Sequence, residues 1–215
     1  MKQLLYKELK LSTHPTTYLF LLFGAMLLIP AYPYYVAFMY MCLAVFFVFL
    51  TGRENKDVFF TALLPVAKGD AVRARCLLVA LMELAQLAVA VPFALLRAKL
   101  MPGMPNTTGM EANVALFGLT LVMFGGFNLI FLPTFYRTGY SAGRALLFGG
   151  TFVLLYIVLA EATTYFVPCM MALDTADPGK QAGQLPVLLI GAAVFALATY
   201  FACRLSVRRF EKVDL

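Results

Sequence analysis

Residues 16–51 read TTYLFLLFGAMLLIPAYPYYVAFMYMCLAVFFVFLT, and this stretch contains no charged side chain. As one helix it would be about 54 Å long at ~1.5 Å per residue, whereas the hydrocarbon core of a bilayer is about 30 Å thick. Pro30 and Pro33 lie at its middle, and proline removes a helical hydrogen-bond donor and restricts the residue before it. The stretch therefore predicts two membrane-spanning helices, 16–32 and 34–51, joined by a very short turn.

The rest of the chain repeats this apolar character. Hydrophobic residues make up 62% of it and charged residues 13%, against roughly 25% charged in a soluble domain. The alternation expected of membrane β-strands is absent, and helices are the other structure that satisfies the backbone in lipid. The sequence predicts an all-α membrane protein, a single transmembrane domain over 1–215 with six spans. The remaining four are expected at 76–96, 114–135, 145–168 and 185–203.

The distribution of Lys and Arg predicts the orientation of these spans. Six spans place both termini on one side of the membrane, and basic residues favour the cytoplasmic side. Fourteen of the 17 Lys and Arg residues fall in the termini and in the second and fourth loops. The other three are Arg97, Lys99 and Lys180. Both termini are therefore expected in the cytoplasm. The same pattern explains the net charge of +6 as topology and attraction to anionic lipid, so no nucleic-acid partner is predicted.

Few groups in the chain could carry catalysis. HExxH, GxSxG and GxxxxGK[ST] are all absent, so the sequence predicts neither an enzyme nor a nucleotide site in this chain. The only histidine, His14, precedes Pro15 in a pattern typical of a helix start. Four cysteines without a CxxC pair or zinc-like spacing lie in or beside apolar runs, and no metal or cofactor is predicted. These are Cys42, Cys76, Cys169 and Cys203.

Two carboxylates lie inside predicted spans. An ionised group at the centre of a span costs about 2.5 to 3.5 kcal/mol, so Glu83 and Glu161 are expected to face a partner or a watery cavity. Gln86 is three residues after Glu83 and shares its helix face. One interpretation is a translocation path or proton site. The other is interhelical hydrogen bonding by a protonated carboxyl, or, for Glu161, a position near the headgroups.

The loop between the second and third spans contains a compact unit, RENKDVFFTALLPVAKGDAVRAR (53–75). Asn55 or Asp57 can cap a short helix that Pro65 ends, and Asp70 can cap the third span. The helix would carry an apolar patch, each large side chain of which contributes roughly 1.5 to 3 kcal/mol when buried. Such a patch either lies on the membrane surface or enters a groove on a partner. It consists of Val58, Phe59, Phe60, Leu63 and Leu64.

Three motifs, in order, resemble those of the permease subunits of ABC-2 type bacterial exporters. MKQLLYKELKL (1–11) is similar to the basic amphipathic helix with which those permeases begin. ENKDVFFTALLPVAKGDAVRARCL (54–77) is similar to their charged, aromatic loop, which holds a coupling helix. LPTFYRTGYSAGRALLF (132–148) is similar to the segment that joins their fourth and fifth spans. The motifs cover roughly the N-terminal two-thirds, and the remainder matches in topology.

The resemblance implies half of an exporter in a bacterial plasma membrane. It implies a second permease copy or paralogue, and two separate ATPase subunits that bind ATP and Mg²⁺. The substrate it suggests is an amphipathic peptide, since some family members export bacteriocins and modulin-like peptides. The alternatives from the residues alone are a proton-coupled carrier that uses Glu83 or Glu161, and a membrane scaffold without transport.

The resemblance also assigns residues. It places the docking of the ATPase on the short helix, with a charged rim around it, and a further contact on the second cytoplasmic loop. The docking residues are Asp57, Phe59, Phe60, Leu63, Leu64 and Pro65. The rim is Arg53, Lys56, Asp57 and Lys68. The second loop contributes Arg137, Gly139, Tyr140 and Arg144.

Overall fold

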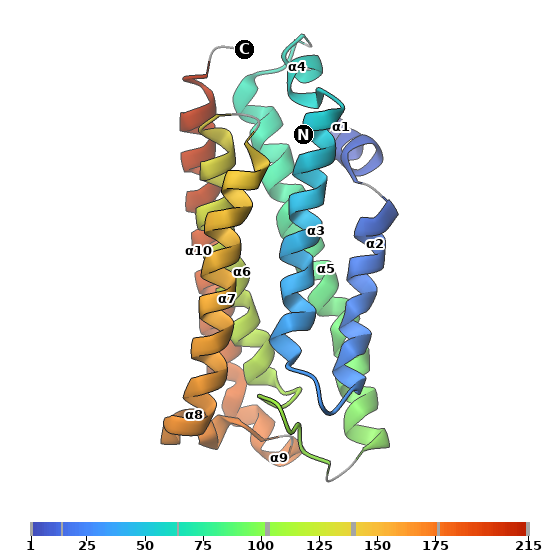
Figure 1. Ribbon diagram of the computed structural model, residues 1–215, viewed down its shortest axis with the longest axis vertical. Helices are drawn as coiled ribbons and strands as arrows, with labels where there is room; N and C mark the ends of the chain where they lie inside the picture. The colour runs from blue at the N-terminus through green and yellow to red at the C-terminus, as the bar shows by residue number, and fades with distance from the viewer. Residues whose placement is uncertain are drawn as a thin grey trace.

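Figure 1 shows the computed structural model of the protein, which describes residues 2–13, 15–63, 65–101, 104–138, 141–175 and 177–213. Every regular element in these ranges is helical, which confirms the predicted all-α class. The long elements are α3 (Tyr34–Glu54), α5 (Lys68–Leu100), α6 (Val114–Tyr136), α7 (Ala142–Phe166) and α10 (Leu185–Phe210). The short ones are α1 (Lys2–Lys7), η1 (Glu8–Ser12), α2 (Pro15–Leu21), η2 (Leu22–Leu28), α4 (Asp57–Ala62), α8 (Pro168–Leu173), α9 (Pro178–Gln181) and η3 (Ala182–Gln184).

Five helices are long and apolar enough to cross a membrane, and a shorter apolar helix, Thr16–Leu28, occupies most of the first predicted span. That segment changes geometry along its length, from α-helix in α2 to 3₁₀-helix in η2. Ile29 leaves helical geometry, and α3 begins directly after Pro33. The two prolines therefore separate two antiparallel helices, as the sequence indicated, but the first helix ends four residues before the predicted 32.

The third helix is longer than predicted at both ends. The expected span was 76–96, whereas α5 covers 33 residues and includes Arg73, Arg75, Arg97 and Lys99. It also begins at Lys68, with Ala67 before it, so Asp70 lies in its first turn and does not cap it. The helix extends past its apolar run because charged residues at both ends find partners: Arg75 pairs with Glu8, and Arg97 pairs with a residue of the following loop.

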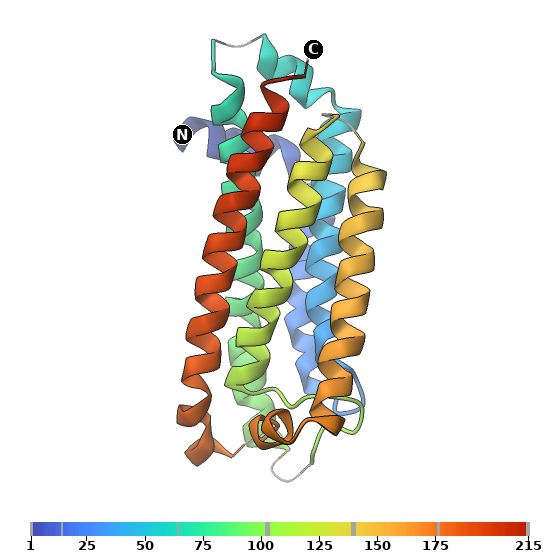
Figure 2. The same ribbon diagram turned by 90° about the vertical axis from the view of Figure 1, so that its left-hand side faces the viewer.

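The two ends of the bundle differ in character. Both termini and α4 lie at one end, and α8, α9 and the non-helical connection after α5 lie at the other (Figures 1 and 2). We call the first the basic end, because fourteen of the 17 Lys and Arg residues lie in the termini and connections there or in the helix ends that adjoin them. We call the second the opposite end.

Aromatic side chains fill the core between α3 and α6. Phe49 makes edge-to-face contacts with Phe131 and Phe135, at ring-centroid distances of 5.2 and 4.7 Å. All three side chains are fully buried. Such pairs contribute about 0.5 to 1.5 kcal/mol beyond the burial of their area. This aromatic core holds α3 against α6 near the basic end.

Helix α10 packs closely against α6 (Figure 2). Gly118 on α6 and Gly191 on α10 meet backbone to backbone: a Cβ atom on Gly118 would lie 2.7 Å from the Val187 carbonyl oxygen, and one on Gly191 would run into the backbone of Gly118. Close approach of this kind is how helices gain packing energy inside a membrane, where lipid tails are as apolar as leucine. The rest of α10 is largely exposed, with Leu189 at 68%.

The orientation of the bundle can be tested with reporter fusions. Fusions at Met104 and Ala182, which lie at the opposite end, should report an external position. Fusions at Lys68, Thr138 and Leu215 should report a cytoplasmic one, because the positive-inside bias acts on the loops that carry the basic residues. A paired alkaline phosphatase and fluorescent protein series measures this. A single loop on the reverse side would contradict the six-span arrangement.

Candidate functional site

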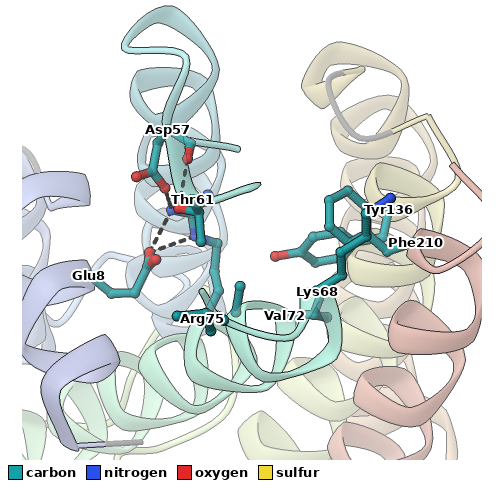
Figure 3. A pocket seen from close by; sticks show the side chains of 10 residues that line it. Glu8, Asp57, Thr61, Lys68, Val72, Arg75, Tyr136 and Phe210 are labelled. Atoms are coloured by element: carbon teal, nitrogen blue, oxygen red, sulfur yellow. Dashed lines mark hydrogen bonds and ion pairs between the residues drawn. The ribbon is translucent and has the colours of Figure 1, made fainter. Parts of the chain in front are cut away.

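A network of ion pairs lies beneath α4 at the basic end (Figure 3). The Nζ of Lys7 lies 2.6 Å from Asp57 Oδ1, and it donates to Thr61 Oγ1 at 2.6 Å. The Nε of Arg75 donates to Glu8 Oε2 at 2.7 Å, and its Nη2 pairs with Asp57 Oδ2. We call these five residues the ionic cluster. It joins three segments: the N-terminal helix, α4 and α5.

The cluster is shielded from solvent and balanced in charge. Glu8 is 2% exposed and Arg75 3%, so their attraction is weakly screened. The Arg75 guanidinium also lies 5.6 Å from the centre of the Phe49 ring, a cation–π distance. A Cβ on Gly52 would lie 2.9 Å from Arg75 Nη1, so the glycine makes room for the guanidinium. The carboxylates of Glu8 and Asp57 therefore meet the cations of Lys7 and Arg75. Removing one of these side chains would leave a buried charge that is not fully neutralised.

The shape of α4 explains which residues join the cluster. Lys56 has a φ of 53°, a left-handed conformation that turns the chain sharply from α3 into α4. Asp57 and Thr61 are four residues apart, so they share the helix face that points toward α5. Phe60 and Leu63 are 55% and 85% exposed. The helix is thus ionic on its inner side and apolar on its outer side.

These positions correct part of the sequence interpretation. Asp57 was expected at the docking rim, but its carboxylate points inward and pairs within the chain. Neither Asn55 nor Asp57 caps α4: Lys56 precedes the helix, with no side-chain capping hydrogen bond. The Nζ of Lys68 donates to the Val213 carbonyl at 3.1 Å, so this rim residue contacts the C-terminal segment. The carboxylate of Asp57 points inward because the buried charge of Arg75 attracts the nearest carboxylates.

The other predicted docking residues are distributed as follows. Arg53, Lys56 and Pro65 are exposed. The backbone of Val58 and Phe59 lies in α4, while their side chains are outside the described part of the structure, as is the whole of Leu64. In the second loop, Arg137 and Arg144 are exposed, and Gly139 and Tyr140 lie outside the described residues, as does His14.

A cavity of about 50 Å³ adjoins the ionic cluster and is bounded on its other side by Tyr136 and Phe210 (Figure 3). A water molecule needs roughly 10 to 15 Å³ of such space, so the cavity has room for a few waters. A nucleotide would need a site of several hundred Å³. This cavity therefore does not serve as a nucleotide site.

The intramembrane polar residues of α5 contact different neighbours. Glu83 Oε2 accepts a hydrogen bond of 2.7 Å from Asn128 Nδ2 on α6. Gln86 Nε2 donates at 2.9 Å to the Ala37 carbonyl on α3. Both α5 side chains are fully buried. Glu83 and Gln86, which the sequence placed on one helix face, therefore contact two different helices. For Glu83, the structure contains the interhelical hydrogen bond that was one of its two interpretations.

Glu161 lies near the opposite end and binds the backbone of the connection after α5. Its Oε2 accepts from the Met110 amide at 3.0 Å. The next residue, Glu111, pairs with Arg97 at 3.2 Å, and its own amide donates to Asp174 Oδ1 at 2.8 Å. Burial raises the pKa of the Asp174 carboxyl above its ordinary value. Carboxylates thus anchor this non-helical connection.

Asn106 is part of the same connection, and with Thr107 and Thr108 it forms an Asn-X-Thr triplet, the sequence pattern of N-glycosylation. Its Nδ2 donates to the carbonyls of Tyr32 and Met110, at 3.2 and 3.1 Å. Glycosylation would modify this same nitrogen, which already donates to two backbone carbonyls. The triplet therefore has a structural role in this protein. A second cavity, of about 820 Å³, opens beside it between α5, α6 and α10, with Arg97, Leu121 and Leu188 among its lining residues.

No group of three or more His, Cys, Asp or Glu residues suited to a metal ion occurs within the described ranges. Cys42 and Cys76 are buried, Cys203 is half-buried, and the Cys169 side chain is outside the described part.

Long apolar helices and two chemically distinct ends define a multi-pass membrane protein. Comparison with known families identifies it further. A family profile described as ABC-2 family transporter protein matches residues 3–210, so the chain belongs to this family of ABC transporter permeases. Comparisons with curated proteins and with solved structures give no significant match.

Proposed function

We propose that this protein forms half of the translocation pathway of an ATP-binding-cassette exporter in a bacterial plasma membrane, and that separate ATPase subunits drive it. The observation that carries the proposal is the two-sided character of α4. Its outer side exposes Phe60 and Leu63, and its inner side is tied to α5 through the ion pair of Asp57 and Arg75. A helix built in this way can receive a partner on one side and pass its movement to the spans on the other.

The energies are of the size that such coupling needs. Moving a two-state equilibrium from 1:99 to 99:1 takes about 5.5 kcal/mol of differential binding. Burying Phe60 and Leu63 in a groove of the partner would contribute roughly 1.5 to 3 kcal/mol each. Phe59 and Leu64 belong to the same proposed patch by sequence. The exposed Arg53 and Lys56 would mainly increase the rate of encounter with a partner of opposite charge.

The ionic cluster supplies a route for movement inside the chain. Asp57 and Thr61 each contact Lys7, and Asp57 contacts Arg75, so a displaced α4 pulls on the N-terminal helix and on α5 together. Because α5 runs through the whole bundle, a tilt at the basic end reaches the opposite end. ATP and Mg²⁺ would bind the two ATPase subunits, and a second permease copy or paralogue would complete the pathway.

An amphipathic peptide is the substrate class we propose for export. Of the alternatives, a proton-coupled carrier would need Glu83 or Glu161 on a watery path, and neither residue lines either of the two cavities described above. A scaffold without transport could use the same exposed patch to bind a partner, so the family match is what favours a permease over a scaffold. We therefore favour the ABC permease.

Replacing Leu63 or Phe60 by aspartate should abolish binding of the ATPase. Both side chains are more than half exposed, so the change leaves the fold intact, whereas an unpaired charge in the partner's groove costs several kcal/mol. Co-purification of the ATPase with the permease in detergent measures this, with Leu63→Met as the matched control that keeps an apolar side chain. Transport should be lost together with binding.

Detergent also separates docking from membrane anchoring. If α4 were an interfacial anchor, Leu63→Asp would weaken its contact with the bilayer and leave the ATPase bound in detergent, where no bilayer surface exists. A stoichiometric ATPase on the Leu63→Asp variant would therefore reject α4 as the coupling helix.

A further inference from the structure

An acid and an amide meet about half-way along the bundle, between α5 and α6. Glu83 and Asn128 are both fully buried, and the Nδ2 of Asn128 donates to Glu83 Oε2 at 2.7 Å. The same Nδ2 donates to Thr199 Oγ1 on α10 at 3.2 Å. The two hydrogens of the amide are therefore both engaged, and the contact joins three helices.

The remaining oxygens of this pair have no donor. Glu83 Oε1 and Asn128 Oδ1 are buried, and neither has a hydrogen-bond partner in the described part of the chain. An ionised carboxylate contributes acceptors only, so the pair would hold more acceptors than donors. Leaving a buried acceptor without a donor is unfavourable, and here two acceptor oxygens lack one. One additional hydrogen between Glu83 Oε1 and Asn128 Oδ1 would give both oxygens a hydrogen-bond partner.

Among the described residues, no cation forms an ion pair with Glu83. The groups that face it are Asn128 on α6, Thr199 beyond it on α10, and Cys42 on α3. Arg75 lies eight positions earlier on α5, about 12 Å along the helix axis, and its guanidinium is paired with Glu8. A negative charge at Glu83 would thus be buried at membrane depth without a partner of opposite sign, which is costly.

We propose that Glu83 binds a proton at this site, and that the neutral acid forms a two-point pair with Asn128. The acid Oε1–H donates to Asn128 Oδ1, while the amide Nδ2–H donates to Glu83 Oε2. One proton from water is added to the carboxylate, and no other group changes its charge. Asn128 retains its second N–H for Thr199, so every polar atom of the acid–amide pair has a partner.

The consequence is a proton-dependent link between α5, α6 and α10. The acid keeps its proton while α5 and α6 stay in contact, and it could release it only if they separated. The proton is therefore part of the folded bundle. This inference does not depend on the proposed function, because it concerns the protonation of one side chain in the isolated protein.

Infrared spectroscopy of the purified full-length protein in lipid nanodiscs tests it directly. A protonated carboxyl has a C=O stretch that is separate from those of carboxylates and amides, and carbon-13-labelled glutamate assigns it to this residue type. At neutral pH we expect such a band, its loss in Glu83→Gln, and its retention in the matched control Glu161→Gln. The Glu83→Gln variant should fold normally, because an amide can make the same two contacts.

Two further variants test the partner. Asn128→Leu should shift the band of Glu83 to the frequency of an acid without a hydrogen bond. The double variant Glu83→Gln/Asn128→Asp exchanges acid and amide at constant size, so the band should return with carbon-13-labelled aspartate. A spectrum in which Glu83→Gln removes no band overturns the bound proton, and a band unchanged by Asn128→Leu overturns the pair. If Asn128→Leu does not fold, the double variant alone decides, because absence of its band would also reject the pair.

Discussion

The Gly191→Leu variant is expected to lose its folded bundle. A side chain at this position would have to occupy the space of the Gly118 backbone, which cannot rotate away as a flexible side chain could. Overpacking a core costs about 1 to 3 kcal/mol and occasionally more, and a clash with backbone belongs at the upper end. Gly118 and Gly191 lie where the two backbones are closest, so a side chain at position 191 would force α10 away from α6 along this part of their interface.

Thermal unfolding and size-exclusion chromatography in detergent measure this effect. Gly143→Leu is the matched control, since Gly143 is also helical and has no neighbouring atom within 4 Å of an added Cβ. The control should behave as wild type, and Gly191→Ala should show an intermediate loss of stability. A Gly191→Leu protein that is as stable as the control would show that α10 does not pack on α6 in this register.

The Arg75→Met variant should destabilise the protein by about 3 to 5 kcal/mol, the usual cost of removing one partner from a buried ion pair. Methionine fills a similar length but leaves Glu8, which is 2% exposed, without its main cation. Arg73→Met provides the control two positions away: its side chain is 58% exposed and pairs with the exposed Asp70, so a change of at most about 1 kcal/mol is expected.

A double variant separates lost charge from lost packing. Replacing both partners of a buried pair by apolar residues is often neutral or even stabilising, so Glu8→Met should restore much of the stability that Arg75→Met removes. Denaturant or thermal unfolding of the four proteins gives the coupling energy. Additive effects of the two substitutions would mean that Glu8 and Arg75 do not form the pair that anchors the N-terminal helix.

Much of the fold follows from the position of charge along the chain. The uncharged run 16–51 with its central prolines predicted two helices, and the structure has α2–η2 and α3 there. The short helix before Pro65 was also predicted, because charge, apolar residues and a terminating proline follow one another within a few positions. These are local signals, and each acts through the hydrogen bonding or solvation of the segment that carries it.

The partners of the buried polar groups could not be predicted in the same way. Glu83 stood out in the sequence, but no local pattern links it to Asn128 or Thr199, and only the packing of α5, α6 and α10 brings these three residues together. Likewise, Glu8 is one charge among several in a basic segment. Its pairing with Arg75 spans 67 positions, so no local pattern reports it. Asp57 points inward for a related reason, because it pairs with Arg75 and Lys7 in the same cluster.

The 3₁₀ geometry of η2 bears on the bilayer around this protein. A 3₁₀-helix rises about 2.0 Å per residue, against about 1.5 Å in an α-helix. The seven residues of α2 and the seven of η2 therefore extend about 25 Å, where an α-helix of the same length would extend about 21 Å. The hydrocarbon layer is about 30 Å thick, and each ångström of mismatch costs a fraction of a kcal/mol. The 3₁₀ turns thus reduce the mismatch without removing it. Local thinning of the bilayer would remove the remainder, so we expect membranes of shorter acyl chains to suit this side of the bundle best.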